Sequence, residues 1–504
     1  MGEAKRKALA RHEESVALDT FGGRIHVEWD PDAAATPLGQ LPFFIDFLKV
    51  SGLFNAWVDD CPLTYESNNA PDKRAVLATF LLSILAGHQR YAHITAIRQD
   101  GIQPELLGFK QLVSEDAARR ALKKIEETTG VAWLERHIDK TTRPLLSTPW
   151  ILDLDATVKC LYGKQEGALI GFNPKKPGRP SHCYHSALMA NTRLALRVDV
   201  MAGNETAPSH SMPGIWTWLD SLSKNERPQL LRGDIAYGNE SVLSAAESRN
   251  QHYLSKLKLT QNVKRLIKEL FRHECWEEAG QGWEGIEDTL LLKGWSRSRR
   301  VVVLRRKLTG EMVLTDKEMD EFQGKFAFIE AAIPTARYEY AVLVTSTTHP
   351  ILSLAQLYRD RADSENNFDE LKNQWGWGGF TTQDLARCQL MARMVALVYN
   401  WWTLFVRLAQ PDKHLEAITS RPLLLHGVAT QTRHGGQTRL MITSIHAKQA
   451  KIQAVLKNLA AFLATLKDTA EQLTDAERLQ AILKRAFAKF MNAKSHSPPQ
   501  LAFN

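Results

Sequence analysis

The sequence predicts an α/β protein in which a mixed sheet is flanked by helices, interrupted by a β-rich insertion and bordered by helical N-terminal and C-terminal regions. Three observations support this fold class. Apolar residues recur at helical spacing from Leu38 to about Leu146, alternate with polar residues from Pro149 onward, and return to helical spacing after Asp384. Strand-like and helical segments take turns in the middle of the chain, as is typical of an α/β domain.

The composition is that of a folded protein with a basic balance. The 504 residues include 64 Lys and Arg against 56 Asp and Glu, and the formal net charge is +8. A basic surplus favours polyanionic partners such as nucleic acids. The five cysteines form no Cys-x-x-Cys pair, so neither a disulfide framework nor a cysteine zinc site is predicted, and a reducing cytoplasmic, nucleoid-associated location is expected. No signal peptide and no membrane span are predicted.

Residues 1–147 are predicted to form a helical N-terminal region. Two apolar segments of helical period, LPFFIDFLKVSGLFNAWV and KRAVLATFLLSILAGHQRYAHITAI, are separated by the turn-forming stretch ESNNAPDK. Further on, Ser114 can cap a helix whose outer face is basic. That helix fits a DNA-end-binding element and a solvated surface helix equally well. Its basic residues are Arg119, Arg120, Lys123 and Lys124.

A catalytic domain is predicted over residues 148–405. The segment WILDLDATVKCLYG alternates as a strand does, with Asp153 and Asp155 on its polar face, and periodicity alone cannot separate these two aspartates. Further strand-like runs and a helix follow, and QLLRGDIAYGN then reads as a buried strand that closes with Asp234. The strand ends therefore supply acidic side chains to one sheet.

A β-rich insertion is predicted at about residues 252–350, within the catalytic domain. Its segment Lys293–Lys307 holds seven Lys or Arg, no Asp or Glu, and Trp295. A basic strand with an indole suits contact with a DNA strand. A second basic segment, GFNPKKPGRPSHCYH, follows the first predicted strand and could track a DNA backbone through Lys175, Lys176 and Arg179.

Residues 406–504 are predicted to form a helical, basic C-terminal region. It begins near the end of MARMVALVYNWWTLFVRLA, which has the continuous apolar character of a buried helix. From His446 to Lys494 an amphipathic segment carries nine Lys or Arg against four Asp or Glu.

The segment YRDRADSENNFDELK has the most informative spacing in the chain. On one α-helix its residues Tyr358, Arg361, Glu365 and Lys372 would share roughly a 60° arc. A carboxylate, two cations and an aromatic hydroxyl at one surface suit metal-dependent chemistry on phosphate, because carboxylates hold hard divalent cations while Arg and Lys hold phosphate oxygens. A surface helix with several ion pairs is the alternative interpretation.

This spacing resembles the signature of bacterial insertion-sequence transposases with an Asp-Asp-Glu (DDE) active site: Tyr, two residues, Arg, three residues, Glu, six residues, Lys. The resemblance implies an RNase H-like catalytic domain that uses two Mg²⁺ ions, with Mn²⁺ as a substitute. It favours Asp155 over Asp153 as the first catalytic aspartate, because Thr157 follows two positions later. The implied catalytic and metal-binding residues are Asp155, Asp234 and Glu365, and the implied DNA-binding residues are Tyr358, Arg361, Lys372, Trp295, Arg299 and Arg300.

The implied activity is cleavage at the ends of an insertion sequence followed by strand transfer. The implied partners are double-stranded DNA, comprising terminal inverted repeats and target DNA, and a second copy of the chain in a homodimeric synaptic complex. In the resembling family an aromatic residue of the insertion stacks on a displaced base, and Trp276, Trp283 and Trp295 are the candidates. Two alternatives stay open: a metal-dependent DNA endonuclease without strand joining, and a domesticated DNA-binding protein without catalysis.

Overall fold

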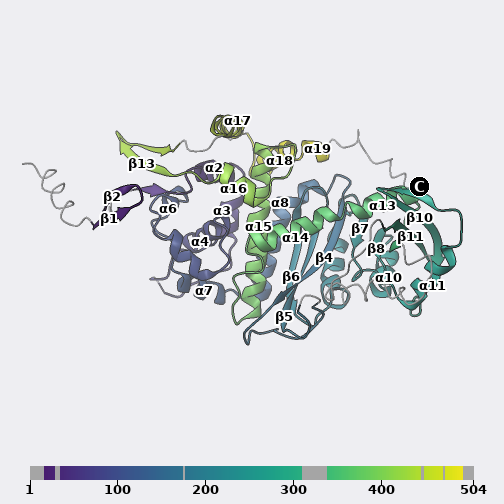
Figure 1. The fold of residues 1–504 in the computed structure, drawn as a ribbon. Coiled ribbons are helices and arrows are strands. Elements are labelled where there is room, and N and C mark those ends of the chain that lie inside the picture. Colours follow the sequence, from purple (N-terminus) through teal and green to yellow (C-terminus); the bar gives the residue numbers. More distant parts are fainter. Residues whose placement is uncertain are drawn as a thin grey trace, which may run out of the picture.

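A nine-stranded mixed sheet forms the centre of the protein in the computed structural model, which describes residues 16–28, 34–67, 69–173, 176–308, 338–443, 448–468 and 472–491. The strand order is β6-β5-β4-β7-β8-β12-β11-β10-β9; β4, β7 and β8 run parallel, and the other neighbouring pairs are antiparallel. The predicted mixed sheet with flanking helices is confirmed (Figure 1). The strands that begin the sheet are β4 (Ile151–Cys160), β5 (Ser181–Met189), β6 (Leu194–Ala202), β7 (Leu230–Gly233) and β8 (Tyr253–Lys256).

Strand β4 is longer than its neighbour β7, so its second half extends past the end of the β7 ladder. Its apolar residues Leu152 and Leu154 are buried, as the alternation predicts. β4 pairs with β5 along its whole length, whereas its pairing with β7 stops where Leu154 meets Gly233. From Asp155 onward, β4 therefore has no β7 residue beside it in the ladder.

The strands of the insertion continue the same sheet. β12 pairs with β8 through Leu343–Thr345, and β11, β10 and β9 follow outward. The proposed division into residues 1–147, 148–405 and 406–504, with an insertion at 252–350, stays a prediction; β8 falls inside that insertion range but pairs with β7. The insertion contains α11 (Gln261–Leu270), β9 (Glu277–Gly280), β10 (Trp283–Leu290), β11 (Arg299–Lys307) and β12 (Tyr338–Thr345).

The chain before β4 is mainly helical. Ser114 caps α7, since its hydroxyl oxygen accepts a hydrogen bond from the Ala117 N–H at 3.2 Å, as predicted. Arg120 and Lys123 of that helix and Lys124 at its C-cap are exposed. The longer helices of this region are α2 (Leu41–Val50), α3 (Leu53–Asp59), α4 (Lys73–Leu85), α7 (Glu115–Lys123) and α8 (Glu127–Thr142).

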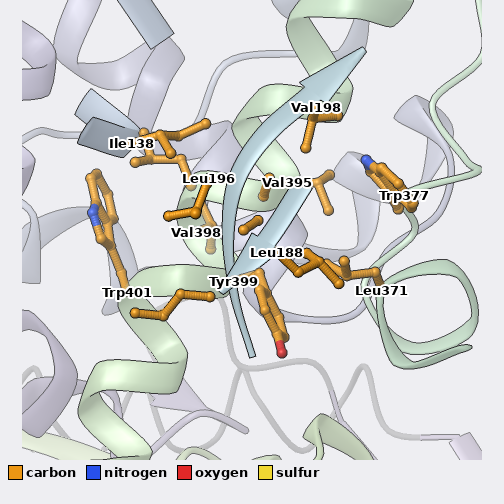
Figure 2. Close-up of a cluster of buried hydrophobic side chains, with 14 of the residues drawn as sticks. Ile138, Leu188, Leu196, Val198, Leu371, Trp377, Val395, Val398, Tyr399 and Trp401 are labelled. Atoms are coloured by element: carbon orange, nitrogen blue, oxygen red, sulfur yellow. The ribbon is translucent and has the colours of Figure 1, made fainter. Parts of the chain in front are cut away.

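Helix α15 (Leu385–Ala409) lies between the N-terminal helices and the sheet (Figure 1). It is buried along most of its length, which explains its nearly continuous apolar sequence. Figure 2 shows Val395 and Val398 of this helix gathered with Leu196 and Val198 of β6. Asn400, a polar residue within its apolar stretch, is buried and exchanges two hydrogen bonds with the backbone of Ala195, at 2.9 and 2.8 Å.

The C-terminal region contains helices, as predicted, and also a β-hairpin that was not predicted. The hairpin joins β13 (Ala429–His434) to β14 (Gln437–Ile442), and β13 also pairs with β3 (Ala35–Thr36). Its two turn residues, Gly435 and Gly436, have φ of 56° and 74°, which glycine adopts readily. The helices are α16 (Ala417–Leu424), α17 (Gln449–Asp468), α18 (Asp475–Ala486) and α19 (Ala488–Met491).

None of the helices in the described part of the chain is by itself long and apolar enough to cross a membrane. The pair α2 and α3, bent by 69°, passes that test only when the two helices are taken together. Most apolar side chains of both helices, including Phe44 and Trp57, are buried in the core.

Candidate active site

The signature segment forms two helices instead of one. α13 (Ile351–Arg359) carries Tyr358, and α14 (Ala362–Gln374) carries Glu365 and Lys372. Between them the chain tightens: the Arg361 N–H donates to the Tyr358 carbonyl at 3.2 Å and the Ser364 N–H to the Arg361 carbonyl at 2.9 Å. These are three-residue steps in place of four, so the prediction of one continuous helical face is wrong, and Arg361 sits at the junction.

A buried ion pair fixes this junction to the sheet. Asp153 of β4 accepts two hydrogen bonds from Arg232 of β7, at 2.6 and 2.7 Å, and both side chains are almost inaccessible. Arg232 also donates to the Leu357 carbonyl in α13, while the Ser364 hydroxyl in α14 donates to Asp153 at 2.5 Å. The charge of Asp153 is therefore balanced by Arg232, and its side chain is buried too deeply to contact a ligand.

Asp155 has a different environment from Asp153. Its side chain is 15% exposed, and its Oδ2 lies 3.2 Å from Nη2 of Arg361. Nη1 of the same guanidinium lies 3.1 Å from Oε1 of Glu365, whose side chain is 66% exposed. Arg361 thus bridges the strand carboxylate and the helix carboxylate, and it brings these two predicted site residues together.

Asp234 lies at the neighbouring strand end. It follows Gly233, the last residue of β7, just as Asp155 follows Leu154, the β4 residue paired with Gly233. Its Oδ1 accepts a hydrogen bond from the Ala236 N–H at 2.9 Å, which closes a tight turn. A Cβ at position 233 would lie 2.6 Å from Cβ of Tyr237, so this turn requires glycine.

The electrostatics of the site connect all of these groups. Burial raises the pKa of Asp155 to about 6; Arg361 acts against this shift, and Asp234 and Glu365 add to it. Burial also raises the pKa of Tyr358 to about 12; Arg361 opposes this, while the three carboxylates reinforce it. The three predicted catalytic carboxylates therefore act on the same neighbours, and Tyr358 and Arg361 lie within their field.

The donor set fits a divalent cation in chemistry, but the observed spacing does not form a closed site. Asp155, Asp234 and Glu365 offer only carboxylate oxygens, which hard cations such as Mg²⁺ prefer. Nevertheless, among the described residues no three His, Cys, Asp or Glu side chains are grouped closely enough to hold a metal ion. Arg361 supplies the positive charge between Asp155 and Glu365 in this arrangement.

The raised pKa of Asp155 predicts a pH-dependent stability. Because the folded protein holds this proton more tightly than the unfolded chain, the stabilisation is complete below about pH 4 and is lost as the pH rises through about 6. Asp155→Asn mimics the protonated acid, so without metal it should be more stable than wild type at pH 8, by at most about 3 kcal/mol, and equal to it near pH 4. Thermal melts of both proteins in EDTA from pH 4 to 8 measure the difference. A difference that does not change with pH would contradict the shift.

Lys372 lies at the far end of α14, where a second lysine joins it. A Cβ at Gly378 would lie 3.8 Å from both Cγ of Lys372 and Cδ of Lys159. Lys159 shares the polar face of β4 with Asp155, its amine donates to the Gly379 carbonyl at 3.5 Å, and burial lowers its pKa to about 8. Sequence reasoning missed Lys159, although strand alternation places it on the Asp155 face.

The predicted DNA-binding residues of the insertion are engaged in contacts within the protein. Arg299 is buried, with its guanidinium over the Trp295 ring at 4.8 Å and ion pairs of 2.5 and 2.7 Å to Glu240 and Glu247 of α10 (Glu240–Ser248). Arg300 binds Glu287 and donates to two backbone carbonyls at 2.7 and 2.9 Å. In this arrangement Arg299 stabilises the packing of the insertion on α10 and offers no free donor surface to a phosphate.

The other two tryptophans considered for base stacking also contact arginines. The Arg305 guanidinium lies 3.8 Å from the Trp276 ring centroid, and that of Arg306 lies 5.0 Å from the Trp283 centroid. Trp276, Trp283 and Trp295 are all partly exposed. Each keeps some ring surface at the solvent, so none is excluded from stacking on a base by burial.

The adjacent strand ends of the mixed sheet and the neighbouring helix bring three carboxylates near an arginine and a tyrosine, and this set of side chains suits phosphoryl transfer. Comparison with protein families makes this specific. The family described as Transposase DDE domain group 1 matches residues 63–464, and the chain belongs to that family. Domains of this family generally use divalent metal ions.

Two other comparisons add little to this. No curated protein matches the chain. Among solved structures, the cryo-EM structure of the piggyBac transposase synaptic complex with hairpin DNA is similar at 10% sequence identity and a TM-score of 0.37, over 90% of this chain and 86% of that chain. The family match therefore identifies the protein as a DDE transposase without support from this weak structural likeness.

Proposed function

We propose that this transposase binds the ends of a DNA element, cuts a strand there, and joins the freed 3′ hydroxyl to a second strand, with Asp155, Asp234 and Glu365 as its catalytic carboxylates. The proposal rests on one observation above the rest. In a chain of the DDE transposase family, Arg361 bridges Asp155 and Glu365, and Asp234 occupies the adjacent strand end.

Each side chain has a role that its position supports. In cleavage, the oxygen of a water molecule bonds to phosphorus, the bond from phosphorus to the 3′ oxygen breaks, and the leaving oxygen takes a proton. Bound Mg²⁺ or Mn²⁺ would stabilise the attacking and leaving oxygens. Asp155, Asp234 and Glu365 would hold the ions, and binding requires that Asp155 lose the proton that burial favours.

Arg361 and Tyr358 would contact the phosphate. The guanidinium already lies between two carboxylates, so ions bound there would free it to donate to phosphate oxygens in its bidentate geometry. The Tyr358 hydroxyl is protonated at neutral pH, as tyrosine hydroxyls ordinarily are, and can donate to the same group. Lys372 would contact a phosphate further along the strand. We further propose double-stranded DNA ends and target DNA as substrates, and a homodimer as the synaptic assembly.

The test is a cleavage and joining assay on DNA that carries the element's own ends, with Mg²⁺ or Mn²⁺, comparing wild type with Glu365→Gln at matched DNA binding. Glu365 is exposed, so the variant is expected to fold normally. Cleavage and joining by wild type, both lost in Glu365→Gln, is the expected result. Cleavage without joining would favour an endonuclease. DNA binding without metal-dependent cleavage by wild type would favour a protein that only binds DNA.

A further inference from the structure

The connection between β4 and β5 carries an exposed aromatic residue flanked by two cations. Tyr162 is 69% exposed, its hydroxyl lies 2.6 Å from Nζ of Lys176, and the Arg179 guanidinium lies 4.8 Å from its ring centroid. Between residues 161 and 180 the sequence has four Lys or Arg and one Glu. An exposed ring beside cations is the combination with which proteins bind single-stranded nucleic acid.

This connection is anchored at several points. The Glu166 N–H donates to the Gln383 carbonyl at 2.9 Å, and its Oε2 accepts from the Leu385 N–H at 3.0 Å, at the start of α15. The Glu166 carbonyl accepts from His182 of β5 at 2.8 Å. The Ser181 N–H also donates to the Leu169 carbonyl at 3.0 Å. The segment that carries Tyr162 is therefore tied to α15 and to the sheet that bears Asp155.

Tyr162 lies two residues beyond the end of β4, the strand that carries Asp155. Asp155 and Lys159 share one face of β4, and Tyr162 follows the end of this strand at Cys160. Five strand residues span about 17 Å, so the cluster lies a few nucleotides from Asp155. A DNA strand leaving the carboxylates along β4 would pass Lys159 and then reach Tyr162.

Resting on the proposed function, we infer that Tyr162, Lys176 and Arg179 form a binding site for unpaired DNA next to the cleavage site. Tyr162 stacks on a base that has left the duplex, and Lys176 and Arg179 bind the phosphates on either side of it. An unpaired base presents its face to such a ring, whereas a base stacked inside a duplex does not, so the site discriminates single-stranded from fully paired DNA. The apolar neighbours Ile170 and Phe172, 62% and 82% exposed, extend this surface.

The experiment measures DNA affinity of the full-length chain in EDTA, so that no cleavage is needed. The probes are a blunt duplex of mixed sequence and the same duplex with a single-stranded tail. Binding of each probe is measured by fluorescence anisotropy. Tyr162→Ala should weaken binding of the tailed duplex about tenfold, as the loss of one base stack does, and leave the blunt duplex within about twofold. Tyr162→Phe is the matched control, because it keeps the ring and should keep the affinity for the tailed duplex.

Three results would overturn the inference. Equal affinity of Tyr162→Ala and wild type for the tailed duplex would remove the role of the ring. If Tyr162→Ala changed the sedimentation coefficient of the protein but not its DNA affinity, the surface would instead contact a second copy of the protein. Wild type that binds neither probe would overturn the proposed function as well, whereas the first two results leave that function standing. A thermal melt of each variant confirms that this exposed substitution leaves the fold intact.

Discussion

Asp155→Asn should reduce DNA cleavage and joining at least about 10³-fold, because charge stabilisation by a bound metal contributes several kcal/mol to the transition state. The variant loses one charge and no volume. Arg361 pairs with both Asp155 and Glu365, so in the variant its guanidinium keeps the ion pair with Glu365. The fold and the affinity for DNA in EDTA should therefore stay close to those of wild type. Cleavage rates at matched DNA occupancy measure the effect.

A carboxylate elsewhere on the surface provides the matched control for this substitution. Asp220 at the end of α9 (Met212–Ser221) pairs with Arg249 at 2.9 Å, away from the strand ends, so Asp220→Asn removes the same charge without loss of cleavage. If Asp155→Asn kept wild-type cleavage rates, Asp155 could not be the first catalytic aspartate.

Asp153→Ala should destabilise the protein by about 3 to 5 kcal/mol, since it leaves the Arg232 guanidinium buried without its counter-ion. It also removes the acceptor of the Ser364 hydroxyl, and so loosens the junction between α13 and α14. Thermal and urea unfolding of the variant and wild type measure the loss. Cleavage should fall as well, through misplacement of Arg361 and Glu365.

A second substitution separates the buried charge from the lost contact. In the double variant Asp153→Ala with Arg232→Met, no charge stays buried, so part of the lost stability should return while the clamp on the junction stays absent. A single Asp153→Ala variant as stable as wild type would show that the pair contributes nothing to the fold.

The two aspartates show how far the sequence could be followed. Alternation of polar and apolar residues placed Asp153 and Asp155 on one face of a strand, which the structure confirms. It could not tell which aspartate forms a buried ion pair. That depends on Arg232, far along the chain, which reaches Asp153 only because β7 lies parallel to β4 in this register. Strand register between distant segments is set by the whole sheet, and no local pattern encodes it.

Two local features were also difficult to predict. The apolar and polar spacing around Tyr358 fits an uninterrupted helix. The tightened turn at Arg361 lies between two contacts with the sheet, that of the Leu357 carbonyl with Arg232 and that of Ser364 with Asp153. The β13–β14 hairpin did leave a signal, because Gly435 and Gly436 separate two alternating segments. It was hidden by the strong helical character of the sequence on both sides.

The basic segment of the insertion shows a further limit. Counting Lys and Arg from Lys293 to Lys307 indicates a cationic surface, but Arg299 turns inward to Glu240 and Glu247. Those carboxylates belong to a helix formed by an earlier part of the chain. Charge patterns in one segment therefore predict the kind of partner, while tertiary pairing decides which side chains are free to meet it.

Because β8 pairs with β7 on one side and with β12 on the other, the described strands of the insertion and the carboxylate-bearing strands belong to one continuous sheet. Bending the sheet at this boundary would break the hydrogen bonds between β8 and β12. Any change of shape needed to carry a base from the cut end to the insertion would then fall on the DNA, for which a bend of 40–90° costs on the order of 1 to 6 kcal/mol. In this transposase the DNA, and not the protein sheet, would therefore change shape when the complex forms.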